Sequence, residues 1–393
     1  MSVTILGGGI GGLALANALH RAGIDFELYE QAPELTEVGA GIGLSRGVLE
    51  LLDALGLGED VRARGQRLER IYLTDPQLRV RRELPANYSG FCIHRALLIE
   101  ILASRLPAER LHLSSRVTGV RSHTGRAEID FADGTTLESG CVVAADGIHS
   151  VVRQSLFPEV RIRWIDQTIW RGITRTEVPP MVAGGYIEAS GEGLRFLSVP
   201  LNAEEILWLA VKPAPPGERD DPETVRDELL QLFHNFHPAF RDLIRQSQNF
   251  LRNDMADLGP PNRPWHHQRV GFLGDAIHAT TPNLAQGGCQ AIEDGVCLAL
   301  CLAACGSDVE RAFRDYGRLR LKKVAFVVNT SWRIGRAVHS RNPLVYHLAR
   351  LMVERSPASF VARQERFLSD MSYLREIDTV GMMGGVGAAA APA

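Results

Sequence analysis

The chain has 393 residues, of which 45% are hydrophobic and 23% are charged. This is the composition of a globular protein, and it excludes a disordered or collagen-like chain. The formal net charge is −3, so no basic footprint points to a nucleic-acid partner. The length predicts two or three domains, each large enough to bury a core.

The chain start and the cysteines indicate a cytoplasmic protein. The first predicted strand begins at Val3, which leaves no room for a signal peptide, and no run of 18 apolar residues predicts a transmembrane helix. Four of the six cysteines fall in one apolar stretch, with Cys297, Cys301 and Cys305 four residues apart. Because no histidine joins this stripe, it predicts helix packing and no bound metal.

The first 160 residues predict the first part of a nucleotide-binding α/β domain. Their pattern of strand, glycine-rich turn, helix and strand is a βαβ opening. In chain order we expect a strand at 3–6, a helix at 13–21, a strand at 26–30, a helix at 48–55, a hairpin at 71–83, a helix at 95–106, strands within 117–143 and a buried strand at 141–145.

The pattern changes after residue 160, where alternating apolar residues predict an antiparallel sheet at 160–212. A helix at 223–236, a strand at 270–275, a helix at 287–305 and further helices at 309–370 follow. The expected domains are the nucleotide-binding α/β domain at 1–160 and again at 266–325, a substrate domain at 161–265, C-terminal helices at 326–375 and a disordered tail at 376–393.

Gly7, Gly9 and Gly12 form the pattern G-x-G-x-x-G between the first strand and the first helix. The first glycine permits a tight turn, the second lets a pyrophosphate approach the backbone, and the third allows close packing of helix and strand. Unpaired N–H groups of the helix then face the phosphates. Glu30 ends the next strand, where a carboxylate accepts hydrogen bonds from a ribose. These residues predict a bound dinucleotide without choosing between NAD and FAD; a glycine-rich turn with no ligand is the alternative.

Two later motifs distinguish between NAD and FAD. Together with the glycine-rich loop, and in the same order, they resemble the class A, single-component FAD-dependent aromatic hydroxylases. The resemblance runs from residue 1 to about 370 and implies a Rossmann-like FAD-binding domain with an inserted antiparallel β-sheet domain and C-terminal helices. The two motifs are Asp146-Gly147 with the trailing Arg153, and Gly274-Asp275 followed by Pro282 and Gly287-Gly288.

The resemblance implies that Asp275 binds the ribityl chain of FAD and that Arg95 lies beside the cofactor. A carboxylate suits polyol hydroxyls, and the N-terminus of the 287–305 helix favours negative charge on the reduced flavin. The expected cofactor contacts are Gly7, Gly9, Gly12, Glu30, Arg95, Val117, Asp146, Asp275, Gly287 and Gly288. The alternatives are a simple turn at Asp146-Gly147 with Ser150 as a helix cap, a surface ion pair for Arg95, and a structural carboxylate for Asp275.

The chemistry also follows from the resemblance. NADH or NADPH is expected to bind transiently and reduce the flavin, since no second dinucleotide motif is present. Reduced flavin then activates O2 as a flavin hydroperoxide, which oxygenates an aromatic ring inside a closed, apolar site. His278 suggests a general base, but family members often carry a histidine there without that duty. No catalytic residue is therefore assigned.

Two subgroups of the family are most similar to this chain. The Thr281 to Leu284 run and the stretch from Asn329 to Pro343 resemble the alkyl-quinolone monooxygenases, and the 191–195 segment with Arg195 resembles the urate hydroxylases. Asn283 and Leu207 replace an aspartate and a tyrosine of the urate enzymes, which favours a more apolar substrate. The expected substrate contacts are Arg195, Trp170, Trp208, Pro282 and Asn283; for Arg195 the alternative is packing or a surface pair.

The sequence therefore predicts an FAD-dependent monooxygenase that hydroxylates a small aromatic or heteroaromatic compound with NAD(P)H and O2. The alternatives are epoxidation, halogenation or reduction of an alkene or polyprenyl chain on the same scaffold, and a non-catalytic flavin- or ligand-binding protein. The sequence leaves open the substrate and the role of Arg46, where relatives carry Pro-Asn or Ser-Asn. It also leaves open whether the C-terminal helices close the core, form a homodimer or touch a membrane.

Overall fold

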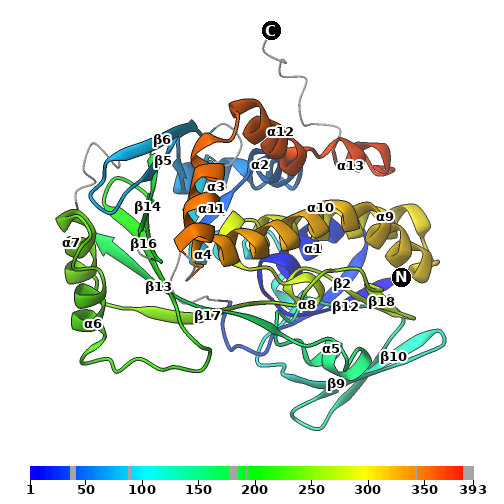
Figure 1. Cartoon of the computed structure of the whole chain (residues 1–393). Helices are drawn as coiled ribbons and strands as arrows, with labels where there is room; N and C mark the ends of the chain where they lie inside the picture. The colour runs from blue at the N-terminus through cyan, green and yellow to red at the C-terminus, as the bar shows by residue number, and fades with distance from the viewer. Residues whose placement is uncertain (36–40, 87–89, 177–184, 192, 341–342, 384–393) are drawn as a thin grey trace.

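The computed structural model describes residues 1–35, 41–86, 90–176, 185–191, 193–340 and 343–383. Two large sheets organise the molecule, and α10 (Val309–Val338) runs across it from α9 (Gly287–Cys305) toward the second sheet (Figure 1). Two smaller sheets accompany them, one of β11 (Thr136–Ser139), β10 (Arg126–Phe131) and β9 (Val117–His123), the other of β3 (Gly41–Leu44), β7 (Phe91–His94) and β4 (Gln66–Arg67).

The first large sheet has six strands, and all neighbours are parallel except the edge pair β18–β19. Its central strand β1 buries four of its five residues, with Val3 and Ile5 fully buried, as expected for a parallel strand covered on both faces. The strand order is β18 (His266–His267), β19 (Val270–Phe272), β12 (Val142–Ala144), β1 (Ser2–Leu6), β2 (Asp25–Tyr29) and β8 (Leu111–His112).

Helix α1 (Ile10–Arg21) packs directly on α9, and both lie in the main core. Close approach depends on glycine, because a methyl group at Gly295 would lie 2.6 Å from the Leu15 backbone nitrogen. By length and composition α9 could span a membrane, but 78% of it is buried inside the protein. Buried Cys289, Cys297 and Cys301 confirm the packing role expected for this cysteine-rich helix.

The second large sheet has seven strands. Most pairs are antiparallel as predicted, but β14 pairs parallel with β5, so the hairpin expected at 71–83 joins this sheet from outside the 161–265 segment. Helices α6 (Val225–Leu232) and α7 (Pro238–Gln246) cover one face (Figure 1). The order is β17 (Leu251–Asp257), β13 (Arg163–Arg175), β16 (Glu205–Pro213), β15 (Leu194–Pro200), β14 (Gly185–Gly191), β5 (Arg70–Thr74) and β6 (Val80–Pro85).

The remaining helices surround the first sheet or follow α10. Met382 and Met383 are buried in the main core, so the described part of the tail expected at 376–393 packs against the protein. Residues 384–393 lie outside the described chain. Glu192 and Asn342, which the sequence analysis placed in segments that resemble the family, also lie outside it. These helices are α2 (Arg46–Ala54), α3 (Gly58–Arg64), α4 (Arg95–Ala103), η1 (Ala108–Arg110), α5 (Val151–Leu156), α8 (Asp275–His278), η2 (Pro282–Leu284), α11 (Pro343–Arg355), α12 (Ala358–Ser369) and α13 (Ser372–Glu376).

Replacing Gly295 by alanine tests the α1–α9 contact. The added methyl group must push the α1 backbone away, and we expect the free energy of unfolding to fall by about 1–3 kcal/mol. Gly317→Ala in α10 is the matched control, because its nearest neighbour would be Trp265 Cβ at 3.8 Å and alanine favours a helix. Urea unfolding of both variants is the measurement; equal stability of the two would contradict the packing argument.

Candidate active site

The three predicted motifs meet at one edge of the first sheet. A methyl group at Gly7 would lie 2.4 Å from the Ala145 carbonyl oxygen, so the glycine-rich loop touches the Asp146-Gly147 segment. The Leu273 N–H donates to the Ala144 carbonyl at 3.0 Å, which brings in Gly274-Asp275. This is the carboxyl edge of the parallel strands, where α/β sheets bind their ligands.

The loop geometry fits the roles predicted for its glycines. Gly7 has a positive φ of 117°, and a methyl group at Gly12 would lie 2.0 Å from the Gly7 carbonyl oxygen. Gly9, by contrast, faces open space, with no atom within 4 Å of the corresponding position. The Glu30 carboxylate accepts hydrogen bonds from the N–H groups of Gly8 (2.6 Å) and Ala32 (2.9 Å). Glu30 thus stabilises the turn, and the open space beside Gly9 can receive a phosphate group.

Asp275 begins α8 and is exposed between buried neighbours. Partial desolvation raises the pKa of its carboxyl, although nearby His278 and Arg95 oppose that shift. Arg95 is also close enough to Arg171 of β13 for their charges to interact. Burial, with the neighbouring charge of Arg95, lowers the pKa of Arg171 to about 10. The neighbouring charges of Arg95 and Arg171 form a positive region, which suits an anionic cofactor.

A network of buried ionic groups fixes the segment that carries Asp275. The Asp294 carboxylate of α9 accepts hydrogen bonds from the Gly274 N–H (2.9 Å) and from Arg320 of α10 (2.8 Å), and it lies 2.5 Å from His278 Nε2. These charges hold the pKa of Asp294 down at about 2 despite its burial. The His278 ring is therefore paired with Asp294, which favours a structural role for His278 over that of a general base.

Arg195 of β15 is bound on both sides. Its guanidinium donates to Glu188 of β14 and to Asn283 Oδ1, at 2.9 and 2.8 Å, and the residue is only 5% exposed. The Tyr186 hydroxyl donates to the other Glu188 oxygen at 2.8 Å. Burial and the carboxylate raise the pKa of Tyr186 well above its usual range, so it stays protonated. The structure therefore unites two predicted residues, Arg195 and Asn283, with two that the sequence analysis missed.

Trp170 and Trp208 lie on the other face of the same sheet. Both belong to the cluster under α6 and α7, and their indole N–H groups donate to Asp220 and Ser247. Because side chains alternate along a strand, Phe196 is on that face and Arg195 is not. The structure therefore does not bring these two tryptophans, which were predicted to contact the substrate, together with Arg195.

His339, just after α10, is a further polar group near Arg195. Its Nδ1 lies 2.8 Å from the Gly193 carbonyl oxygen, so Nδ1 carries the proton. Burial and the positive charge of Arg195 lower the pKa of His339 to about 3. The ring is neutral at pH 7, and its buried Nε2 is an acceptor without a hydrogen-bond partner among the described residues.

His339 continues a stripe on α10 in which Ser331 and Gly335 precede it at intervals of four. Asn283 Nδ2 donates to the Ser331 carbonyl at 3.1 Å, and Gln167 Nε2 donates to the Gly335 carbonyl at 2.8 Å. Like His339 Nε2, Gln167 Oε1 and Ser331 Oγ are buried without a partner in the described chain. This face of α10 thus gathers hydrogen-bonding capacity that the protein itself does not use.

The other predicted residues are also placed. Pro282 is exposed at the start of η2, and a methyl group at Gly288 would lie 2.4 Å from Ile42; Gly287 and Gly288 begin α9. Val117 opens β9, two residues after Ser115, whose N–H donates to the Glu30 carbonyl. Arg46 is exposed and lies 3.5 Å from Glu50, which gives it a surface ion pair.

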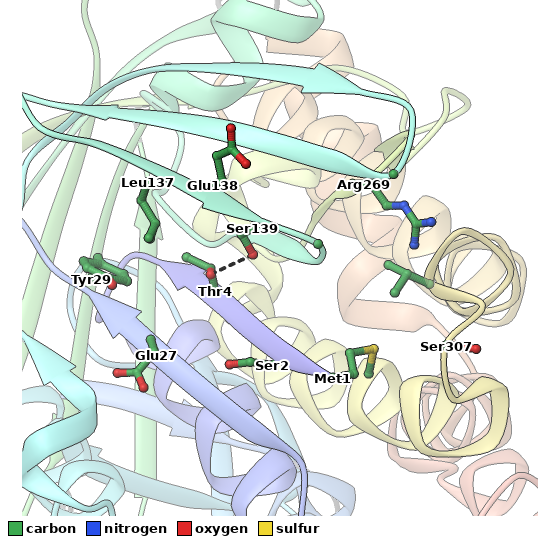
Figure 2. A pocket seen from close by; sticks show the side chains of 13 residues that line it. Met1, Ser2, Thr4, Glu27, Tyr29, Leu137, Glu138, Ser139, Arg269 and Ser307 are labelled. Carbon is green, nitrogen blue, oxygen red and sulfur yellow. Dashed lines mark hydrogen bonds between the residues drawn. The ribbon is translucent and has the colours of Figure 1, made fainter.

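A cavity of about 410 Å³ lies elsewhere, between the first residues of β1, Glu27 and Tyr29 of β2, and β11 (Figure 2). The Thr4 hydroxyl donates to Ser139 Oγ across it at 2.9 Å. Since ligands of parallel sheets bind at the carboxyl ends of the strands, this cavity is not the predicted cofactor site.

The residues at the sheet edge fit FAD. Gly9 leaves space at the loop, Arg95 and Arg171 supply positive charge, and the accessible Asp275 is a hydroxyl acceptor. Asp146 Oδ1 is buried without a hydrogen-bond partner among the described residues, so it is free to accept one from a ligand.

Comparison with known proteins identifies the class. Residues 1–331 match the family described as FAD binding domain. Aurachin C monooxygenase/isomerase of Stigmatella aurantiaca is 36% identical over 85% of this chain and 89% of its own length. The 2-heptyl-3-hydroxy-4(1H)-quinolone synthase of Pseudomonas aeruginosa is 28% identical over 91% and 94%. The crystal structure of Klebsiella pneumoniae HpxO with FAD and uric acid matches with a TM-score of 0.85 at 25% identity, covering 94% of this chain and 97% of that chain.

The chain is therefore an FAD-dependent monooxygenase that uses NAD(P)H as co-substrate. It belongs to the FAD binding domain family, among the aromatic hydroxylases, as the sequence motifs predicted.

The unusual state of His339 predicts a pH dependence of stability. Between pH 6.5 and about 3 the unfolded chain protonates this histidine and the folded chain does not, so folding stability falls as pH is lowered through this window. From pH 7 to pH 5 the loss attributable to His339 is about 2 kcal/mol. The His339→Asn variant keeps a donor for the Gly193 carbonyl and has no side chain that titrates here. Its folding stability should therefore not show this fall at low pH.

Thermal midpoints measured between pH 5 and pH 7 test the assignment. We expect a steeper fall for the wild type than for His339→Asn, while His234→Asn, at an exposed position, follows the wild type. Parallel curves for all three proteins would show that His339 is protonated in the folded state as well.

Proposed function

We propose that the enzyme hydroxylates a neutral heteroaromatic ring of the quinolone type, which carries an N–H or O–H donor and an apolar substituent. The observation that carries this proposal is the buried contact of Arg195 with Glu188 and Asn283. This contact bears on the charge of the substrate that the site can accept, because Arg195 is the residue that the family resemblance places at the substrate.

The charge of Arg195 is already balanced inside the protein. Glu188 neutralises the guanidinium, and Tyr186 and Asn283 complete the hydrogen bonds around the pair. A substrate carboxylate here would place two acids beside one buried cation, and a buried charge without its own partner is strongly unfavourable. A neutral ring with a carbonyl or hydroxyl group carries no such cost.

The other polar groups favour a hydrogen-bond donor. His339 Nε2, Gln167 Oε1 and Ser331 Oγ are buried and unpaired among the described residues, and a buried acceptor gains most when a ligand supplies the missing proton. Ile165, Ile169, Leu197, Val211 and Met255 form an apolar cluster on the sheet face beside Arg195, and Trp332 packs against it. This face suits a hydrocarbon substituent.

The relatives support this substrate class. The Pseudomonas relative is named for a 2-heptyl quinolone, which combines a heteroaromatic ring with an alkyl chain. The replacement of an acid by Asn283 and of a tyrosine by Leu207, relative to the urate hydroxylases, points the same way. The predicted domain boundaries, a cytoplasmic location and a monomer or homodimer remain part of this proposal.

In this proposal the cofactor and the residues of the chain have separate roles in catalysis. Bound FAD, reduced by NADH or NADPH, supplies the electrons and the activation of O2. Gly7, Gly9, Gly12, Glu30, Arg95, Asp146, Asp275 and the start of α9 would hold it. Arg195, Asn283 and His339 would orient the ring, and the apolar sheet face would exclude water, which protects the oxygenating step from wasteful decay.

Glu188→Gln tests the charge argument, because glutamine keeps the shape and the bond to Arg195 but removes the negative charge. We expect kcat/KM for a 2-alkyl-4-quinolone to fall and that for a 4-quinolone-2-carboxylate to rise, so that their ratio shifts by about tenfold or more toward the acid. Glu205→Gln is the matched control, since Glu205 pairs with the exposed Arg175 on the same sheet. An unchanged ratio in Glu188→Gln would contradict the proposal.

A further inference from the structure

Helices α11 and α12 carry most of the exposed large hydrophobic residues. Eleven such residues are exposed in the described part of the chain, and six of them lie in α11 and α12. Single exposed apolar residues are common in soluble proteins, but a group on one element marks an interaction surface. The six are Leu344, Val345, Leu348, Met352, Val353 and Phe360.

Helix α11 is oriented with its apolar side outward. Leu344, Leu348 and Met352 are four residues apart and form one stripe, with exposures of 66%, 52% and 76%. Polar contacts join the end of this helix to β6. Arg81 of β6 lies 3.4 Å from Glu354, and Arg82 donates to the Ser356 carbonyl at 2.6 Å. A surface helix ordinarily buries its apolar side, so the exposed Leu348 and Met352 mark this side of α11 as an interaction surface.

The charges on this part of the chain indicate the kind of partner. Between residues 333 and 369 every exposed ionic side chain in the described chain is an arginine, whereas Glu354 and Glu365 are partly buried. Burial also raises the pKa of Glu365 to about 7, which reduces its negative charge further. The whole chain has a net charge of −3, so this is a local concentration of positive charge. The exposed arginines are Arg333, Arg336, Arg355, Arg363 and Arg366.

We propose that α11 and α12 dock the enzyme on the surface of an anionic lipid bilayer. Apolar side chains that enter the acyl boundary, together with arginines that meet acidic headgroups, are the features of helices that lie in the membrane interface. A second copy of the chain fits this surface less well, because self-association would bring the arginines of both copies together. The assignment is independent of the substrate class proposed above.

The docking surface adjoins the proposed substrate site. Helix α10 ends at Val338, next to His339, and α11 begins at Pro343 and contacts α10. A ring with an alkyl chain partitions into lipid, so a docked enzyme would find such a substrate at the membrane beneath it. Access to a substrate dissolved in lipid would thus explain why the apolar stripe lies next to the proposed substrate site.

Vesicle flotation of the full-length, FAD-loaded protein tests the proposal. Vesicles contain phosphatidylcholine alone or an equal mixture with phosphatidylglycerol, and no substrate is added. We expect the bound fraction to be about fivefold or more higher with phosphatidylglycerol and to fall in high salt, as for arginine–headgroup attraction. The double variant Leu348→Asp/Met352→Asp should lose binding, and Arg355→Glu/Arg363→Glu should lose the preference for the anionic lipid.

Leu113→Asp is the control, since Leu113 is exposed outside these helices. FAD content and thermal midpoint establish that each variant is folded. Binding that is absent, equal for both lipids, or unchanged in the two double variants overturns the proposal. So does a dimer, detected by sedimentation, that Leu348→Asp/Met352→Asp dissociates, because the stripe would then be a contact between two copies. Because the assay needs no turnover, its result stands whether or not quinolones prove to be substrates.

Discussion

The site depends on charges that the protein buries completely. Glu293 and Asp294 are adjacent in α9 and fully buried, and they pair with Arg320 and Lys323 of α10. Breaking such a pair leaves an uncompensated charge and costs about 3–5 kcal/mol. The network also includes His278 and Tyr373. It therefore locks together α8, which carries Asp275, the core helix α9, the C-terminal α13, and α10, whose far end carries the groups around Arg195.

This arrangement gives one helix two functions. The first half of α10 supplies cations to the buried network, and its last turns, with His339 just after them, lie on the proposed substrate side through Ser331 and Gly335. The relative position of the cofactor edge and the substrate face is thus set by a single rigid element. The seven-stranded sheet completes the site from the other side, with Arg195 held by Glu188, so that the polar groups are ordered before any ligand arrives.

The proposed cofactor half of the site could be predicted from the sequence because its chemistry is local. A glycine loop between a strand and a helix, and Glu30 at the end of the next strand, each occupy a few consecutive residues. The substrate half could not, because it depends on strand register. Nothing in the sequence states that Ala210 pairs with Phe196, and this register places Trp208 on the face opposite Arg195. Glu188 and His339 reach Arg195 through a hairpin and a distant helix end, and only the fold reveals those contacts.

The central claim is that this hydroxylase prefers a neutral ring because Arg195 is already neutralised. The most direct measurement is NADH and NADPH oxidation by the FAD-loaded wild type, with a 2-alkyl-4-quinolone and its 2-carboxylate counterpart compared at equal concentration. Hydrogen peroxide and product mass are determined in parallel. We predict strong stimulation by the neutral quinolone, little peroxide and a product one oxygen atom heavier. Coupled turnover of the carboxylate at a rate about tenfold above that of the neutral quinolone would contradict the account.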